Sequence, residues 1–177
     1  MTNLSIWRTA ELIPSDLISA KKLIYDICNL QCSQPEAENE STDYSAYRFM
    51  INGKSICYRI AKTTPTKNGQ FVTLWKRNPS GIIEPFDSSD AIDFVIISVR
   101  KENNFGQFIF PKSVLLQKGI FSGPNKEGKR ATRVYPPWDV TTSKQALKTQ
   151  QWQLDYFLDL SDKETIISRT KLLFSFE

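Results

Sequence analysis

Histidine is absent from the 177-residue sequence, and cysteine is scarce. Without histidine, neither a serine–histidine–aspartate triad nor a cysteine–histidine pair can be built, so any general acid or base must be a carboxylate, lysine, tyrosine or cysteine. Cys28, Cys32 and Cys57 are too few for a four-ligand zinc site made of cysteine and histidine. Their odd number also argues against a disulfide framework, and we expect all of them to be small buried residues.

A long hydrophobic run is missing as well. No apolar stretch approaches the roughly 20 residues that a membrane-spanning helix needs, and residues 1–12 lack the basic region and apolar core of a signal peptide. We therefore expect no membrane insertion and a cytoplasmic location, where thiols stay reduced. A length of 177 residues fits a single domain over residues 1–177.

Acidic residues are missing from one long stretch of the chain. Residues 44–83 carry seven basic and no acidic side chains, although the net charge of the whole chain is only +4. A second basic stretch, residues 103–138, carries six basic side chains against Glu127 alone. If the two stretches meet in the fold, they form a positive surface that attracts a polyanion. The alternative is that each stretch pairs with acidic residues from elsewhere in the fold.

Hydrophobic periodicity predicts two long helices, over residues 15–30 and 142–160. Between them lie segments typical of strands, and Asn52-Gly53 is a strong hairpin turn signal. The continuous apolar run over residues 94–99 indicates a central strand that is buried on both faces. Together these segments predict an α/β (α+β) fold with a mixed, largely antiparallel central sheet flanked by helices. The predicted strands are 47–51, 55–61, 70–76, 94–99, 105–110 and the edge strand 133–135, and residues 112–118 are expected to form a short helix.

Four segments of the sequence resemble the MepB-like family of bacterial proteins. They are YRIAKTTPTKNGQFVTLWKR (58–77), GQFIFPKSVLLQKGI (106–120), GKRATRVYPPWD (128–139) and TQQWQLDYF (149–157). The resemblance covers most of residues 36–158. It implies a restriction-endonuclease-like fold that grips DNA, and a link to multidrug resistance, because such proteins are often encoded beside a multidrug efflux pump and its repressor. A fold does not carry an activity with it, so the site must be argued from this chain's own residues.

Nuclease activity needs carboxylates that hold a divalent metal and a lysine near the attacking water. In restriction-type nucleases, an aspartate on one strand and an acid-x-lysine triplet on the next supply these groups. Only Glu127-Gly128-Lys129 fits the triplet, and it lies in a glycine-rich turn. If Lys62 takes the place of the lysine, Ile60 stands at the acid position. This degenerate triplet favours a protein without catalysis and without a cofactor. The alternative is a Mg²⁺-dependent nuclease, whose catalytic candidates are Glu40, Asp87, Asp90 and Lys62, with Glu38, Asp43 and Asp93 as further acids.

Residues 123–129 (GPNKEGK) match the first part of a phosphate-binding loop, GxxxxGK. Such a loop also needs a serine or threonine for Mg²⁺, with a strand before it and a helix after it. Arg130 stands in place of the serine or threonine, and a Val-Tyr-Pro-Pro segment follows in place of the helix. We therefore expect no nucleoside triphosphate as a partner.

Segments rich in cations and hydroxyl groups are the candidate contacts to nucleic acid. Lys62, Lys67 and the threonines between them could bind phosphate oxygens, and Gln70 could read a base edge. Trp138 is more open and lies next to cations, so it could stack on a base, whereas Trp75 follows the strand alternation and is expected in the core. The predicted interface with DNA or RNA consists of Lys62, Lys67, Gln70, Lys76, Arg77, Lys112, Lys129, Arg130, Arg133 and Trp138.

A rival interpretation is a small-molecule or protein-binding accessory factor of drug efflux. It would require a compact apolar cavity lined by tryptophan and phenylalanine, with the basic residues scattered and paired. Gln150, Gln151 and Gln153 could face a groove or a substrate, although helical glutamines are more often solvated. The sequence leaves the choice between DNA and RNA, the sequence preference and the oligomeric state open.

Overall fold

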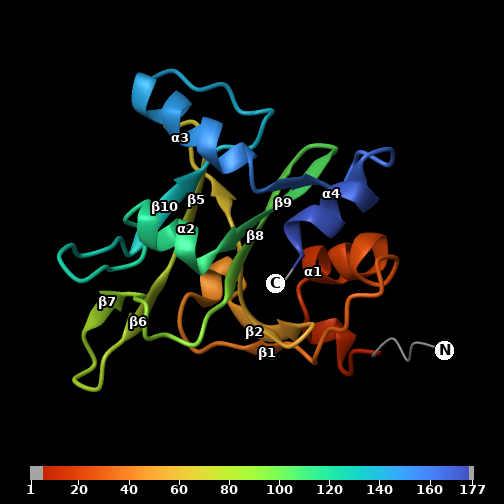
Figure 1. Ribbon diagram of the computed structural model, residues 1–177, viewed down its shortest axis with the longest axis horizontal. Helices are drawn as coiled ribbons and strands as arrows, with labels where there is room; N and C mark the ends of the chain where they lie inside the picture. Colours follow the sequence, from red (N-terminus) through yellow and green to blue (C-terminus); the bar gives the residue numbers. More distant parts are fainter. Residues whose placement is uncertain (1–5, 176–177) are drawn as a thin grey trace.

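A six-stranded sheet forms the centre of the computed structural model, which describes residues 6–175 (Figure 1). Its strand order is β1-β2-β3-β8-β9-β11, and neighbouring strands are antiparallel except β3 and β8, which are parallel. The predicted mixed, largely antiparallel sheet is therefore confirmed. The strands are β1 (Glu36–Ala37), β2 (Tyr47–Ile51), β3 (Lys54–Ile60), β8 (Phe94–Lys101), β9 (Asn104–Pro111) and β11 (Phe157–Asp159).

Two smaller sheets stand beside the central one. In the first, β5 (Gln70–Thr73) pairs with β4 (Lys62–Thr63) on one side and with β10 (Ala131–Val134) on the other. In the second, β6 (Trp75–Arg77) and β7 (Ile83–Pro85) form a hairpin that projects at the lower left of Figure 1.

Helices cover both faces of the central sheet, as expected. In Figure 1, α1 and α4 lie to the right of the central strands, and α2 and α3 lie to the left and above, next to β5 and β10. Each side has its own hydrophobic core. The helices are α1 (Ser15–Ala20), which continues as a π-helical turn (Lys21–Tyr25), α2 (Lys112–Gln117), α3 (Lys144–Leu154) and α4 (Ile166–Leu173), with 3-10 turns at Ala10–Leu12 and Thr42–Tyr44.

The apolar run of residues 94–99 is buried on both faces, as predicted. Ile96 packs into the core beneath α1 and α4, whereas Val95 and Ile97 pack into the core beneath α2 and α3. Successive side chains of a strand point to opposite faces, so a strand between two cores needs apolar residues at consecutive positions. Asn52 and Gly53 both have positive φ (47° and 78°), which matches the hairpin turn predicted between β2 and β3.

The single strand predicted over residues 70–76 is wrong, because the chain changes partners at Leu74. The side chain of Leu74 is 1% exposed, and its backbone N–H donates to Arg130 O at 2.9 Å. Before Leu74, β5 pairs with β10, and after it β6 pairs with β7. The strand β7 lies outside all of the strands predicted from the sequence. Apolar alternation does not record which strand is the partner, so a break of this kind is invisible in the pattern.

The predicted helix over residues 142–160 is shorter than expected and ends at Leu154. The Arg169 guanidinium of α4 donates to the carbonyl oxygens of Leu154 (3.1 Å), Asp155 (2.6 Å) and Phe157 (3.1 Å), so it caps the last turn. The chain then pairs with β9 as β11. The carbonyl groups at the end of α3 are thus bound by an arginine of α4. The sequence of α3 itself contains no signal that predicts where the helix ends.

The cysteines are only partly as predicted, because Cys32 and Cys57 are buried but Cys28 is half-exposed. Within residues 6–175, no helix is both long enough and apolar enough to span a membrane.

Candidate functional site

The outer face of the β10-β5-β4 sheet carries cationic and aromatic side chains in a row. Lys62 lies opposite Phe71 in the strand register, and Phe71 lies opposite Arg133. Directly opposed residues of antiparallel strands share a face, so these side chains are neighbours. The Arg133 guanidinium lies 5.7 Å from the centre of the Phe71 ring, and Lys62 Nζ lies 5.1 Å from the centre of the Tyr44 ring. The row therefore alternates positive charge with aromatic surface.

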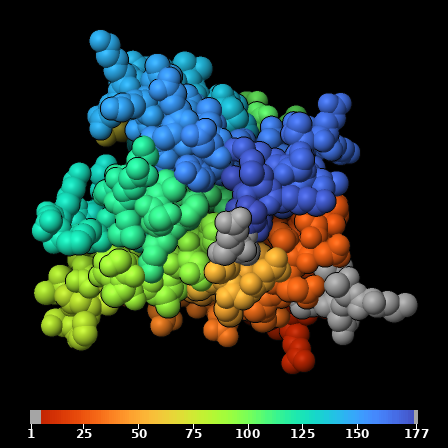
Figure 2. Space-filling view, viewed as in Figure 1, coloured from red at the N-terminus to blue at the C-terminus, as the bar shows by residue number. Residues whose placement is uncertain are grey.

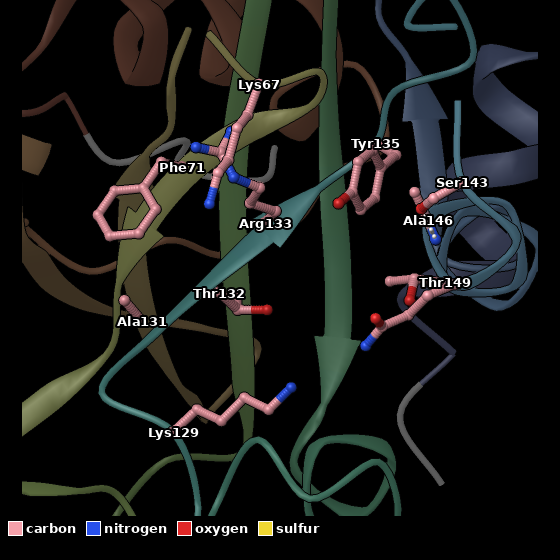
Figure 3. A pocket seen from close by; sticks show the side chains of 11 residues that line it. Lys67, Phe71, Lys129, Ala131, Thr132, Arg133, Tyr135, Ser143, Ala146 and Thr149 are labelled. Atoms are coloured by element: carbon pink, nitrogen blue, oxygen red, sulfur yellow. Dashed lines mark hydrogen bonds between the residues drawn. The ribbon is translucent and has the colours of Figure 1, made fainter. Parts of the chain in front are cut away.

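A groove of about 370 Å³ separates this sheet from α3 (Figure 3). Three cations line it, and we call Lys67, Lys129 and Arg133 the groove cations. Lys129 precedes β10 and Arg133 lies near its end, so the positive charge is spread along the groove. Among the described residues that line it, none is acidic, and four carry hydroxyl groups. The full lining is Lys67, Phe71, Lys129, Ala131, Thr132, Arg133, Tyr135, Ser143, Gln145, Ala146 and Thr149.

Two glutamines of α3 bind the helix to β10 and to the segment that follows it. The Gln153 side chain is completely buried; its Oε1 accepts from Tyr135 N at 2.8 Å, and its Nε2 donates to Arg133 O at 2.9 Å. One turn earlier, Gln150 Nε2 donates to Pro136 O (2.9 Å) and Asp139 O (3.0 Å). The Gln153 amide thus serves the free edge of β10 much as a neighbouring strand would. These bonds set the distance between the two walls of the groove.

Arg133 organises the loop that presents Lys67. Its guanidinium donates to the Thr64 hydroxyl at 2.8 Å and to the carbonyl oxygens of Asn68 and Gly69 at 3.3 and 3.4 Å. Gly69 has a φ of +75°, and a Cβ there would lie 2.6 Å from the Tyr135 ring, so only glycine fits. Arg133 therefore shapes the groove and also contributes charge to it.

Most other cations of the long basic stretch are neutralised. Lys76 Nζ lies 2.8 Å from Asp90, 3.0 Å from Asp87 and 3.7 Å from Glu84. Arg77 Nε lies 2.6 Å from Glu40. Arg59, which is fully buried, and Arg48 both donate to the Glu38 carboxylate. We call these groups the paired cluster, namely Arg48, Arg59, Lys76 and Arg77 with Glu38, Glu40, Glu84, Asp87 and Asp90.

The titration of the paired cluster reflects this pairing. Hydrogen bonds from Ser89 and from the Lys76 ammonium lower the pKa of Asp87 to about 2. Burial lowers the pKa of Lys76, but the hydrogen bonds and negative charges of Asp90 and Asp87 outweigh that effect and raise it above its usual value. Both groups are therefore held in their charged forms.

The predicted interface residues fall into separate places. Lys62 and the groove cations lie along one face and have no ion-pair partner within residues 6–175. Arg130 pairs with Glu127 at 2.7 Å, and Lys112 Nζ donates to Ser88 O at 2.9 Å. The remaining predicted cations, Lys76 and Arg77, belong to the paired cluster.

Of the two predicted contacts to bases, the one by Gln70 is wrong. Gln70 is 1% exposed, and its Nε2 donates to Arg100 O at 3.3 Å, so it faces the protein interior. Trp138 is half-buried, its ring packs edge-on against Phe157 with 5.6 Å between the ring centres, and its Nε1 is buried, so its contact to a base stays a prediction. Conversely, Trp75 was expected in the core but is only half-buried, with the Arg77 guanidinium 5.4 Å from its ring centre.

The acids proposed for the nuclease alternative are engaged with cations. Glu40 pairs with Arg77, and Asp87 and Asp90 pair with Lys76. In the part of the chain that the structure describes, no group of three or more cysteine, aspartate and glutamate side chains is placed to hold a metal ion. The triplet Glu127-Gly128-Lys129 lies in a loop outside any strand, as its sequence indicated.

Sequence reasoning missed several groove residues. Tyr135, Ser143 and Thr149 line the groove but carry no motif. Gln150 and Gln153 were expected to face a groove or solvent. Instead, both side chains form hydrogen bonds with the backbone of the chain beside α3. Their spacing by three residues on a helix next to an edge strand was the available signal. It becomes informative only when the edge strand is known to lie beside that helix.

Comparisons with known proteins point to one family. A family model described as MepB-like matches residues 38–159. A solved structure described as "Crystal Structure of MepB" is 33% identical, with a TM-score of 0.75, over 85% of this chain and 99% of that chain. A structure of a bacterial homing endonuclease is 12% identical over 83% of this chain and 93% of that chain, and its TM-score of 0.45 is too low to carry an argument. No curated protein matches the sequence.

Proposed function

The chain belongs to the MepB-like family, and we propose that it binds DNA or RNA through the groove between β10 and α3. The observation that carries this proposal is the contrast in charge between two regions. The groove cations have no acid beside them among the described residues, whereas the paired cluster is neutralised. Cations left without an acidic partner keep their positive charge available to a polyanion.

Phosphate binding explains the types of residue that line the groove. Lysine and arginine neutralise phosphates, and threonine, serine and tyrosine hydroxyls donate further hydrogen bonds to phosphate oxygens. Thr132, Tyr135, Ser143 and Thr149 supply such hydroxyls along the groove. Because neutralised phosphates release counterions, the affinity must fall steeply as salt rises.

The same lining makes the groove unsuited to the rival interpretation, in which the protein binds an apolar drug as an accessory factor of efflux. An apolar drug would require a cavity walled mainly by aromatic and aliphatic side chains. Phe71, Ala131 and Ala146 are the apolar residues among those described at the groove, and three cations accompany them. Any link to multidrug resistance would then run through a nucleic acid and would not need binding of the drug.

Fluorescence anisotropy with labelled oligonucleotides tests the proposal. Single- and double-stranded DNA and RNA of equal length would be titrated with the parent protein and with Lys129→Glu. We expect the parent to bind at 50 mM salt and Lys129→Glu to bind at least roughly tenfold more weakly.

Lys163→Glu is the matched control, because it makes the same charge change at an exposed position before α4, outside the groove. It should retain the affinity of the parent. Equal losses in Lys129→Glu and Lys163→Glu, or no binding of any oligonucleotide by the parent, would contradict the proposal.

A further inference from the structure

Beyond the groove, α3 continues to Trp152, which lies beside the residue that follows α2, Lys118. Thr149 lines the groove, and Trp152 lies one turn further along the helix, where residues three apart are neighbours. Lys129 is linked to the segment that follows α2, since its backbone N–H donates to Ile120 O at 2.8 Å. Figure 2 shows residues 112–120 and α3 in contact on the same face of the molecule.

Trp152 packs against the protein core and has a lysine over its ring. Its ring packs against Phe110, with 5.4 Å between the ring centres and an angle of 48°. Lys118 Nζ lies 5.3 Å from the centre of the indole. Lys118 is exposed and has no ion-pair partner within the described residues, so its side chain can swing aside. Trp152 itself is half-buried and packs against the core beneath α2 and α3, which fixes the orientation of the ring.

We infer that Trp152 and Lys118 form a stacking subsite next to the groove, one helical turn beyond Thr149, where an unpaired base lies on the indole and Lys118 moves to a neighbouring phosphate. This inference rests on the proposed function. Aromatic rings bind bases of any sequence through their faces, and a lysine that already covers the ring by a cation–π contact keeps that face away from other side chains. The groove cations would then bind the backbone, and Trp152 would bind the base.

Trp75 provides a matched control within the same chain. It too is half-buried with a cation over its ring, since Arg77 lies 5.4 Å from its centre. However, Arg77 is paired with Glu40 at 2.6 Å, and no residue of its strand β6 lines the groove, whereas α3, which carries Trp152, supplies Gln145, Ala146 and Thr149 to the lining. A cation over a tryptophan is therefore not sufficient, and the two tryptophans differ in whether their own element forms a wall of the groove.

The test compares two single strands of equal length and charge, one with ordinary bases and one with abasic sugars throughout. The parent protein should bind the strand with bases roughly tenfold more tightly. Trp152→Leu should lose this difference and still bind the abasic strand as the parent does, whereas Trp75→Leu should retain the difference. If Trp152→Leu keeps the difference, the subsite is wrong. If the parent binds neither strand, the proposed function fails as well.

Lys118→Met keeps the inference testable if Trp152→Leu fails to fold. The Lys118 side chain is exposed, so its replacement should leave the fold intact. The variant should keep the preference for bases, while the slope of log Kd against log salt falls by about 0.7, the value for one phosphate contact on a single strand. An unchanged slope would overturn the role assigned to Lys118.

Discussion

The groove cation Lys67 and the basic residues of the paired cluster come from the same basic stretch of sequence but meet different surroundings. Lys67 reaches the groove, while Lys76 and Arg77, only a few residues later, pair with Asp90 and Glu40. The chain divides at Leu74, where it leaves the β10-β5-β4 sheet for the β6–β7 hairpin. A stretch of basic residues in the sequence therefore need not form a positive surface. The topology of the fold determines which of these residues lie next to acidic side chains from other parts of the chain.

The two regions also differ in what holds them together. The paired cluster contains Arg59, which is fully buried and bound to Glu38, so its charges contribute to the fold. Lys67 and Lys129 are exposed and have no acidic partner in the described part of the chain. Mutations in the first region should change stability, and mutations in the second should change binding.

The largest effect should come from Glu38→Ala in the paired cluster. The change leaves the buried Arg59 without its carboxylate, and removing one partner of a buried ion pair costs about 3 kcal/mol or more. Urea denaturation should show this loss in the free energy of unfolding. The affinity of the folded fraction for nucleic acid should stay unchanged. A loss of affinity without a loss of stability would contradict the division of roles between the paired cluster and the groove cations.

The next effect should come from reversing Lys62 and Lys67 to glutamate together. Both side chains are exposed, so the free energy of unfolding should change little. We expect the affinity for nucleic acid to fall roughly 100-fold or more at low salt, because two cations become repulsive to phosphate. The matched double reversal Lys22→Glu with Lys163→Glu, at exposed positions outside the groove, should bind as the parent does.

A smaller effect should follow from Gln153→Glu, which changes the side chain that binds α3 to β10. The carboxylate can still accept from Tyr135 N, but nothing then donates to Arg133 O. A buried acceptor without a donor costs about 1–3 kcal/mol, which thermal unfolding can measure. Because α3 forms one wall of the groove, the affinity should also fall, and Gln153→Asn would fail to restore it since its side chain is shorter. A variant with the stability and the affinity of the parent would show that the hydrogen bonds of Gln153 do not determine the distance between the two walls of the groove.

The smallest effect should come from Asp87→Asn, and it should depend on pH. The pKa of Asp87 is lowered to about 2 from 3.8, so its charged form stabilises the folded state. This contribution is fully present above pH 3.8 and is lost as the pH falls toward 2. The side chain is 35% exposed, so solvent screening limits the contribution to about 0.5 kcal/mol. The stability difference between the parent and the variant should shrink over this acidic range, and a constant difference would contradict the assignment.

The sequence predicts the central architecture well but the site only in part. The doubly buried strand at 94–99 and the Asn52-Gly53 turn follow from local patterns, and both are confirmed. The groove needs information that local patterns lack, because β10 and α3 meet only through tertiary contacts such as those of Gln153. Gln70 shows the limit most plainly, since its polarity predicted exposure and its strand position buries it.

The salt dependence of binding tests the central claim most directly. Log Kd would be measured against log salt for the parent, for Lys67→Gln and Lys129→Gln, and for Arg77→Gln in the paired cluster. The account predicts a steep slope for the parent, a decrease of about 0.7–0.9 for each lysine removed from the groove, and no change for Arg77→Gln. A flat slope in the parent, or equal decreases in both regions, would contradict it.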